Sequence, residues 1–134
     1  MIVLLVKIFV IAFFINLLYE VLHSVLYKTC LESNLQKYIR LILKAAIFDG
    51  FVITIIYYIE YIIFKNQNLF YSSSQIITFS LISLFFAYIW EIYSLKKKKW
   101  EYSNKMPLIL GVGITPFLQL CMTGILSIYL SLNF

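Results

Sequence analysis

The chain has 134 residues, of which 63% are hydrophobic and 13% are charged, and its formal net charge is +5. Soluble domains contain roughly 45–50% apolar and about 25% charged residues, and a soluble fold of this length has too much surface to hide so many apolar side chains. Intrinsic disorder is excluded because it requires low hydrophobicity. The composition therefore predicts an integral membrane protein, organised as a single domain over residues 1–134.

Four apolar segments, separated by short polar breaks, predict the elements in chain order. The predicted helices cover about residues 2–27, 41–64, 75–95 and 107–130. At ~1.5 Å of rise per residue, each is long enough to cross a hydrocarbon core of ~30 Å. Membrane strands would instead show alternating segments of about 9–11 residues. The prediction is thus an all-α membrane protein with four transmembrane helices in an up-down-up-down bundle.

Lysine and arginine are unequally divided between the two sides of this predicted bundle. Nine of the 11 lie in or beside the breaks at residues 28–40 and 96–106, whereas Lys7 and Lys65 belong to the opposite side. Positive charge accumulates on the cytoplasmic side of membrane proteins. We therefore expect both basic loops in the cytoplasm and both termini outside.

The second basic loop begins with a run of four lysines directly after a predicted helix, and two aromatic residues follow. Lysines at this position contact anionic lipid headgroups, and aromatic rings favour the membrane interface. We interpret the run as a membrane-interface anchor with lipids as its partners, and not as a nucleic-acid site. The predicted interface residues are Lys96, Lys97, Lys98, Lys99, Trp100 and Tyr102.

Several polar residues lie within the predicted helices, where a charged group costs roughly 2.5–3.5 kcal/mol. Counting along the helices places four titratable groups in the cytoplasmic half of the bilayer, while Glu60 falls near the outer surface. Helical spacing puts Asn16 on the same stripe as the first two of these groups. The candidate catalytic residues are Glu20, His23, Asp49 and Glu91, and Asn16 and Gln119 are their predicted polar partners.

Four roles for this cluster stay open. The residues can fasten the bundle by hydrogen bonds alone, or form a proton or ion path. They can also perform acid/base chemistry, because neighbouring carboxylates in a low dielectric repel and one then keeps its proton. The fourth role is a metal site, since Glu20 and His23 have the Glu-x-x-His spacing of di-iron bundles. That site requires a second copy and the chain has one histidine, so no metal ligand is predicted and any cofactor is unknown.

Common catalytic motifs are missing from the sequence, which has no P-loop, no G-x-S-x-G, no H-E-x-x-H and no Rossmann glycine pattern. Two glycines, Gly111 and Gly113, lie at the predicted start of the last helix. We expect them to allow close packing of that helix against its neighbours.

The stretch between residues 90 and 119 carries the most distinctive pattern of the chain. It contains Glu91, then Trp100-x-Tyr102-Ser103-x-x-Met106-Pro107, then Gly111-x-Gly113-x-x-Pro116-x-x-Gln119. Together with Asn16-x-x-x-Glu20 and Asp49, this pattern resembles a group of short bacterial four-helix membrane proteins that has no assigned function. Members of that group have glycine where this chain has Phe48, and His23 is not part of their pattern. The resemblance implies the four-helix bundle and the importance of Glu20, Asp49 and Glu91, and it implies no reaction.

Together, these features predict an inner-membrane protein whose polar pocket opens toward the cytoplasm. We expect the pocket to bind or convert a lipid-like or isoprenoid substrate by acid/base chemistry. The alternative is a small homo-oligomeric transporter or channel subunit in which the same carboxylates form a proton or ion path. Glu60 separates the two hypotheses, because only a transmembrane path requires polar groups through the outer half of the bilayer.

Overall fold

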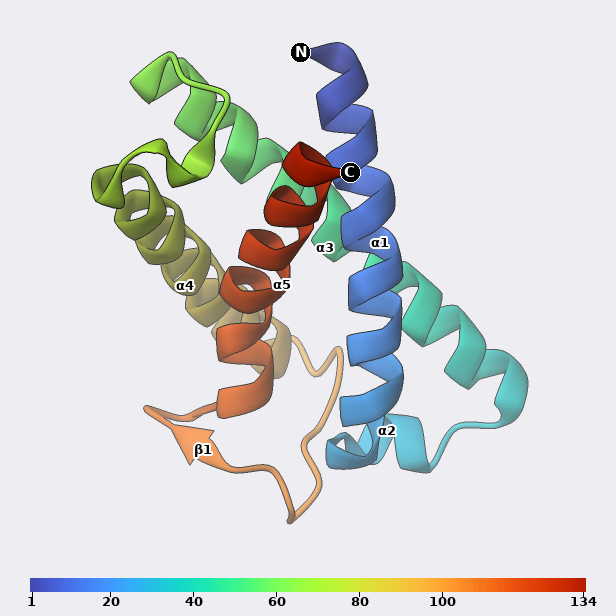
Figure 1. Cartoon of the computed structure of the whole chain (residues 1–134). Coiled ribbons are helices and arrows are strands. Elements are labelled where there is room, and N and C mark those ends of the chain that lie inside the picture. Colours follow the sequence, from blue (N-terminus) through green and yellow to red (C-terminus); the bar gives the residue numbers. More distant parts are fainter.

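The computed structural model describes residues 1–134 and is helical over most of its length (Figure 1). Its four long helices are α1 (Ile2–His23), α3 (Leu35–Phe64), α4 (Ser73–Lys96) and α5 (Ile114–Asn133). The connections contain the short helices η1 (Ser24–Leu26), α2 (Lys28–Leu31) and η2 (Leu69–Tyr71). A small hairpin is formed by the strands β1 (Leu108–Ile109) and β2 (Val112–Gly113). The predicted helical class is confirmed, with the hairpin as its exception.

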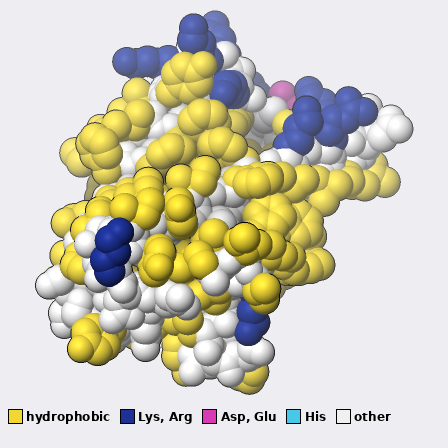
Figure 2. All heavy atoms as spheres, turned by 90° about the horizontal axis from the view of Figure 1, so that it is seen from above, with side chains coloured by type: hydrophobic (Ala, Val, Ile, Leu, Met, Phe, Trp, Pro, Cys, Tyr) yellow, Lys and Arg dark blue, Asp and Glu magenta, His cyan; other side chains and the backbone are white.

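Three helical segments are long and apolar enough to cross a membrane, namely Ile2–Leu26, which joins α1 and η1, and the helices α4 and α5. Their outer surfaces expose large apolar side chains such as Phe14 and Phe85, which are 62% and 68% exposed. Apolar side chains cover much of the face seen in Figure 2. Soluble proteins rarely expose contiguous apolar surface on this scale, so the structure supports helices that span a membrane. The helix α3 is not among the three, and it carries two acidic residues besides the basic residues of its first turns.

Helix α3 begins at Leu35, earlier than the predicted start at residue 41. The side chain of Asn34 accepts a hydrogen bond from the backbone N–H of Lys37 at 2.9 Å, which is a helix N-cap. The short helix α2 occupies another part of the same stretch. The prediction of a loop over residues 28–40 is therefore wrong, because a local cap starts the helix ahead of its apolar part.

Helix α5 begins at Ile114 and not at residue 107, because the hairpin occupies the residues before it. Leu110 and Gly111 lie between the two strands and have positive φ angles of 48° and 84°. Such angles at both central residues are those of a tight hairpin turn. The apolar composition of this stretch made it resemble a helix, whereas its backbone turns sharply.

The two glycines of this stretch do not pack helices together, so that prediction is wrong. A Cβ atom added to Gly111 would meet nothing within 4 Å, and this glycine serves the positive φ of the turn. A Cβ atom added to Gly113 would lie 2.7 Å from the Sδ atom of Met106. Gly113 therefore makes room for a side chain of the preceding loop.

The two basic connections lie against each other, at the end of the molecule opposite the termini (Figure 1). The backbone N–H of Lys28 donates to the carbonyl oxygen of Glu101 at 2.9 Å, and that of Ser103 donates to Leu26 at 2.8 Å. The side chains of Lys28 and Glu101 form an ion pair at 3.5 Å. As predicted, the two connections share one side of the bundle. We call this part the basic end, and it comprises residues 24–34 and 97–113.

The interior between the helices contains both an apolar core and buried polar side chains. Its apolar core includes Ile8, Ile53 and Phe79 and occupies the middle of the bundle and the half nearer to the termini. Toward the basic end a cluster of buried polar side chains joins this core and includes Asn16 and Gln119, while single buried polar residues such as Glu60 also occur in the other half. The polar site is therefore held between helices and not on a surface loop.

Candidate functional site

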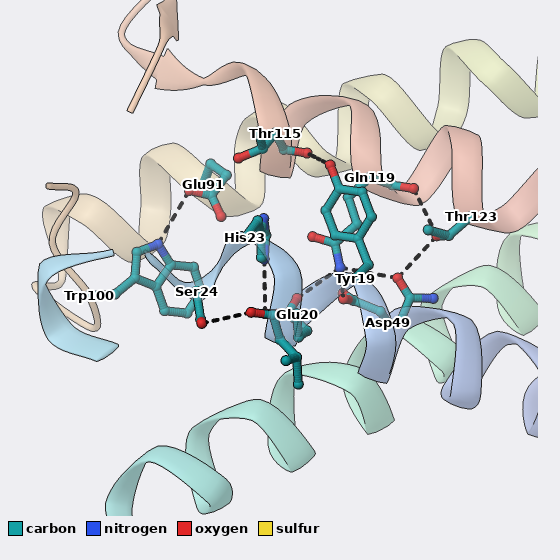
Figure 3. A network of polar contacts seen from close by, with 12 residues as sticks. Tyr19, Glu20, His23, Ser24, Asp49, Glu91, Trp100, Thr115, Gln119 and Thr123 are labelled. Atoms are coloured by element: carbon teal, nitrogen blue, oxygen red, sulfur yellow. Dashed lines mark hydrogen bonds and ion pairs between the residues drawn. The ribbon is translucent and has the colours of Figure 1, made fainter. Parts of the chain in front are cut away.

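The side-chain amide of Gln119, on α5, joins three side chains from two other helices (Figure 3). Its Nε2 atom donates to Oδ1 of Asn16 at 3.1 Å, to Oε1 of Glu20 at 2.8 Å and to Oδ2 of Asp49 at 2.8 Å. Asn16 and Glu20 are one helical turn apart on α1, and Asp49 faces them from α3. An amide nitrogen carries two hydrogens, so three acceptors compete for two of them.

The shared amide holds the carboxylates of Glu20 and Asp49 close together. Their contacting oxygens are at most twice 2.8 Å apart, because each lies at that distance from the same nitrogen. Two negative charges at this separation repel strongly in a low-dielectric interior. A proton shared between the carboxylates, or a cation bound beside them, removes this repulsion.

Asn16 is fixed by two further hydrogen bonds. Its Nδ2 atom donates to the carbonyl oxygen of Ala12 at 2.9 Å, and the hydroxyl of Thr123 donates to its Oδ1 atom at 3.0 Å. These contacts orient the amide so that its oxygen faces Gln119. Thr123 is not among the predicted partners, although it follows Gln119 by one turn on the same face of α5.

His23 is a partner of Glu20 and does not line the cavity described below. Its Nε2 atom lies 3.1 Å from Oε2 of Glu20, while its Nδ1 atom is buried without a hydrogen-bond partner. The rings of Tyr19 and Tyr27 meet the imidazole edge-on, with centroid distances of 4.7 and 5.3 Å. These neighbours keep the imidazole between two rings and one carboxylate.

Glu91, on α4, is held by the loop that follows its own helix. Its Oε2 atom accepts a hydrogen bond from Nε1 of Trp100 at 3.3 Å and another from the hydroxyl of Tyr102. The backbone N–H of Gly113 in turn donates to the oxygen of Tyr102 at 3.0 Å. A chain of hydrogen bonds therefore connects the hairpin to the carboxylate of Glu91, which is 4% exposed.

Trp100 and Tyr102 thus have a contact that the interface prediction did not include. Burial and the hydrogen bond to Glu91 raise the pKa of the Tyr102 hydroxyl, so the hydroxyl keeps its proton and donates. The spacing Trp100-x-Tyr102, read together with Glu91, was the sequence signal for this contact. The spacing alone does not show how the loop runs, and only the folded chain shows that it brings these two side chains back to Glu91.

A cavity of about 510 Å³ opens among these groups. It is lined by 18 residues, of which 10 are hydrophobic, and they come from α1, α3, α4, α5 and the basic end. Glu20, Asp49, Glu91 and Gln119 all contribute to its wall. Mostly apolar walls with a few convergent polar groups are typical of small-molecule sites. Its aromatic lining residues are Tyr27, Phe48, Trp90 and Trp100.

Two lysines lie at the edge of this cavity. Lys44 and Lys99 belong to its lining, and both side chains are exposed. The Nζ atom of Lys99 lies 4.3 Å from the ring centroid of Trp90 and 4.7 Å from that of Tyr93, which are cation–π distances. The lysine run therefore contributes one member to the cavity, while the other three are exposed at the end of α4.

The structure gathers the predicted site residues in two groups around one cavity. Glu20 and Asp49 meet at Gln119, with Asn16 and His23 behind them, whereas Glu91 lies apart from this network and is bound to the loop. No group of three His, Cys, Asp or Glu side chains is arranged to hold a metal ion.

Glu60 is remote from this cavity, on the last turns of α3. It is 1% exposed, and neither carboxylate oxygen has a hydrogen-bond partner. Its carboxylate is thus buried between the helices. It lies near the end of α3, as expected from its place in the sequence, but it does not face outward.

Comparison with known proteins gives no relative of this fold or sequence. No protein-family model matches the chain, and no curated protein or solved structure matches it significantly. The residues of the cavity therefore have to indicate the function by their own chemistry.

Proposed function

We propose that the chain is an integral membrane protein with four membrane-spanning helices, of which α3 is the fourth. Three helices qualify by length and composition, yet both termini lie at the same end of the molecule (Figure 1). Three crossings would separate the termini, whereas four bring them together. α3 has 30 residues, about 45 Å at the usual rise, and its oblique course in Figure 1 suits a long spanning helix.

We infer that the membrane is a bacterial inner membrane and that the basic end faces the cytoplasm. Nine of the 11 lysines and arginines lie in or beside the two basic connections, and the pairing of these connections gives them a common side. The positive-inside rule then assigns that side to the cytoplasm and the termini to the outside.

In this orientation the cavity binds an amphiphile, lipid-like or isoprenoid, that enters from the inner leaflet. The observation that carries this proposal is the cavity itself, whose mostly apolar wall bears carboxylates from three different helices. An apolar chain gains free energy by lying along the hydrophobic residues, while the polar head meets the acids. Glu20 and Asp49 supply an acid and a base in the same pocket, because mutual repulsion keeps one of them protonated.

A photoreactive probe tests this binding in reconstituted vesicles. A neutral long-chain alcohol with a diazirine in its chain should label cavity residues such as Leu41 and Phe48, and mass spectrometry of the peptides locates the adducts. Ala45→Trp, which fills the cavity from α3, should remove this labelling. The matched control is Ile47→Trp on the exposed face of the same helix. Labelling that is spread over lipid-facing residues and unchanged by Ala45→Trp would contradict the proposal.

A second candidate, a proton path through a homo-oligomeric transporter or channel subunit, is favoured by the polar face of α5. Four buried polar residues follow each other at one-turn spacing along α5, from the cavity toward the termini: Gln119, Thr123, Ser127 and Ser131. Near that end α3 holds the buried carboxylate of Glu60 without a partner.

Proton flux into vesicles that contain a pH-sensitive dye distinguishes the candidates. The path predicts flux that Glu60→Gln abolishes, whereas a one-sided pocket predicts no flux and undiminished probe labelling in the same variant.

A further inference from the structure

The three carboxylates of the cavity have no lysine or arginine partner, and His23 beside Glu20 is the one basic side chain that contacts them. The ion pairs of the structure join Lys28 to Glu32 and to Glu101, and His23 to Glu20. No lysine or arginine pairs with Glu20, Asp49 or Glu91. Because buried carboxylates are usually paired with a cation or protonated, a ligand with a positive charge can take the place of the missing lysine or arginine.

Acceptor positions of these carboxylates also stay open. Both donors that reach Glu91 bind its Oε2 atom, so its Oε1 atom accepts no hydrogen bond although the side chain is 4% exposed and lines the cavity. Gln119 binds Oδ2 of Asp49, and Oδ1 is likewise without a hydrogen bond. Neither oxygen is among the fully buried atoms that lack a partner, so both stay accessible from the cavity to a ligand that brings donors or positive charge.

Aromatic rings form another part of the cavity wall. Tyr27, Phe48, Trp90 and Trp100 line the same cavity as the acids. The faces of such rings attract ammonium groups, as the ammonium of Lys99 over Trp90 illustrates within this protein. Carboxylates and aromatic faces together select an organic cation.

We propose that this cavity binds the ammonium group of an amphiphile, with its alkyl chain along the hydrophobic wall. The inference rests on the proposed function, since it requires the cavity to be the ligand site. A metal ion fits poorly, because the acids are not arranged as a ligand set. A phosphate or diphosphate head inside the cavity would face three carboxylates, while the two lysines of the lining stand exposed at its edge.

Tryptophan fluorescence measures this binding directly, because the only two tryptophans of the chain, Trp90 and Trp100, both line the cavity. The protein in a non-ionic detergent is titrated with four small probes below their aggregation concentrations. Hexyltrimethylammonium carries both the cation and a chain, tetramethylammonium the cation alone, hexanol the chain alone, and hexyl phosphate the opposite charge. We expect hexyltrimethylammonium to bind about tenfold or more tightly than hexanol, and hexyl phosphate to bind most weakly.

Variants assign the charge selectivity to the acids. Asp49→Asn and Glu91→Gln should each remove most of the preference for hexyltrimethylammonium over hexanol, and circular dichroism verifies that each variant is folded. If one variant fails to fold, the other still tests the proposal. Glu101→Gln is the matched control, because this acid lies at the basic end outside the cavity and pairs with Lys28. It should leave all four affinities unchanged.

The relative affinities of the four probes either support or overturn the ammonium site. Equal binding of hexanol and hexyltrimethylammonium would overturn the ammonium site while leaving an amphiphile pocket intact, and tighter binding of hexyl phosphate would overturn it as well. Tetramethylammonium binding as tightly as its hexyl analogue would support the cation site and assign it to a water-soluble amine instead of a lipid. Binding of none of the probes would contradict the proposed function itself.

Discussion

A single amide nitrogen organises the polar site at the scale of residues. Gln119 supplies the hydrogen bonds that hold Glu20 and Asp49 against α5, and it also meets Asn16. No other side chain contacts all three residues through hydrogen bonds. The position of the acids in the cavity therefore depends on one residue of the last helix.

Replacing this amide by a hydrocarbon of similar size tests that dependence. Gln119→Leu should lower the free energy of unfolding by about 1–3 kcal/mol for each buried acceptor left without a donor. Thermal unfolding in detergent, followed by circular dichroism, measures the loss. Met122→Leu, on the exposed face of the same helix, should leave the transition unchanged. Unaltered stability of Gln119→Leu would mean that the acids are satisfied without the amide.

The hydroxyl of Tyr102 can be removed without changing the shape of its ring. Tyr102→Phe takes a donor from Glu91 and an acceptor from the N–H of Gly113, and should cost about 1–3 kcal/mol in the same unfolding assay. Tyr71→Phe is the control, because that ring is 76% exposed and its hydroxyl makes no hydrogen bond. Equal effects of the two substitutions would show that the link between hairpin and carboxylate adds no stability.

Cys30 lines the cavity and reports on its charge. Burial, and after it the negative charge of Glu20, raise the pKa of this thiol. Only the thiolate reacts with alkylating reagents, so alkylation at pH 8 should be slower than that of a free cysteine and should increase as the pH rises. In a Cys121→Ala background, which leaves one thiol, Glu20→Gln should accelerate the reaction. Glu32→Gln, an exposed acid at the same end, should not, and equal rates in both variants would refute the influence of Glu20.

Residue patterns predicted much of this site but not its loop contacts. The shared stripe of Asn16 and Glu20, and the polar residue in the last apolar segment, were visible because helical spacing converts sequence positions into faces. The bonds from Trp100 and Tyr102 to Glu91 depend on how the basic end folds back over α4. Spacing alone carries no such information.

At the scale of elements, α4 and α5 pack closely at Gly124. Of the glycines at contacts between helices, this one leaves the least room for an added Cβ atom. A Cβ atom added to Gly124 would lie 2.7 Å from Cζ of Phe79, whose ring is fully buried. Gly124→Ala should therefore destabilise the protein by about 1–3 kcal/mol through overpacking. Thermal unfolding of the single and double variants checks the cause. Phe79→Leu, combined with Gly124→Ala, should recover part of the loss, and simple additivity of the two effects would rule out the steric explanation.

Element boundaries were predictable where apolar length decides them and not where local geometry does. The predicted helix over residues 75–95 agrees closely with α4 at Ser73–Lys96. The stretch ahead of α5 is as apolar as a helix, yet two consecutive residues with positive φ turn it into a hairpin. Hydropathy does not distinguish these structures, because it measures burial in lipid and not backbone conformation.

For the whole molecule, the proposed topology has a direct test. A reporter that is active only in the cytoplasm should be active when fused after Lys99 and inactive when fused after Phe134. Nine of 11 basic side chains are in or beside the two basic connections. Loops rich in lysine and arginine stay on the cytoplasmic side of the membrane. Activity measured in intact cells distinguishes the two fusions. The opposite pattern would reverse the orientation, and activity in both would contradict the crossing by α5, the helix that lies between the two fusion points.

The residues of the polar site are synthesised at different times. Glu20 and Asp49 belong to α1 and α3, whereas the amide that binds them belongs to α5. In the proposed four-helix topology these acids are synthesised and inserted before their donor exists, and each charge inserted alone costs roughly 2.5–3.5 kcal/mol. The early helices must therefore enter with protonated acids or keep them near the headgroups until the last helix arrives. Assembly of the site therefore has to wait for the synthesis of α5.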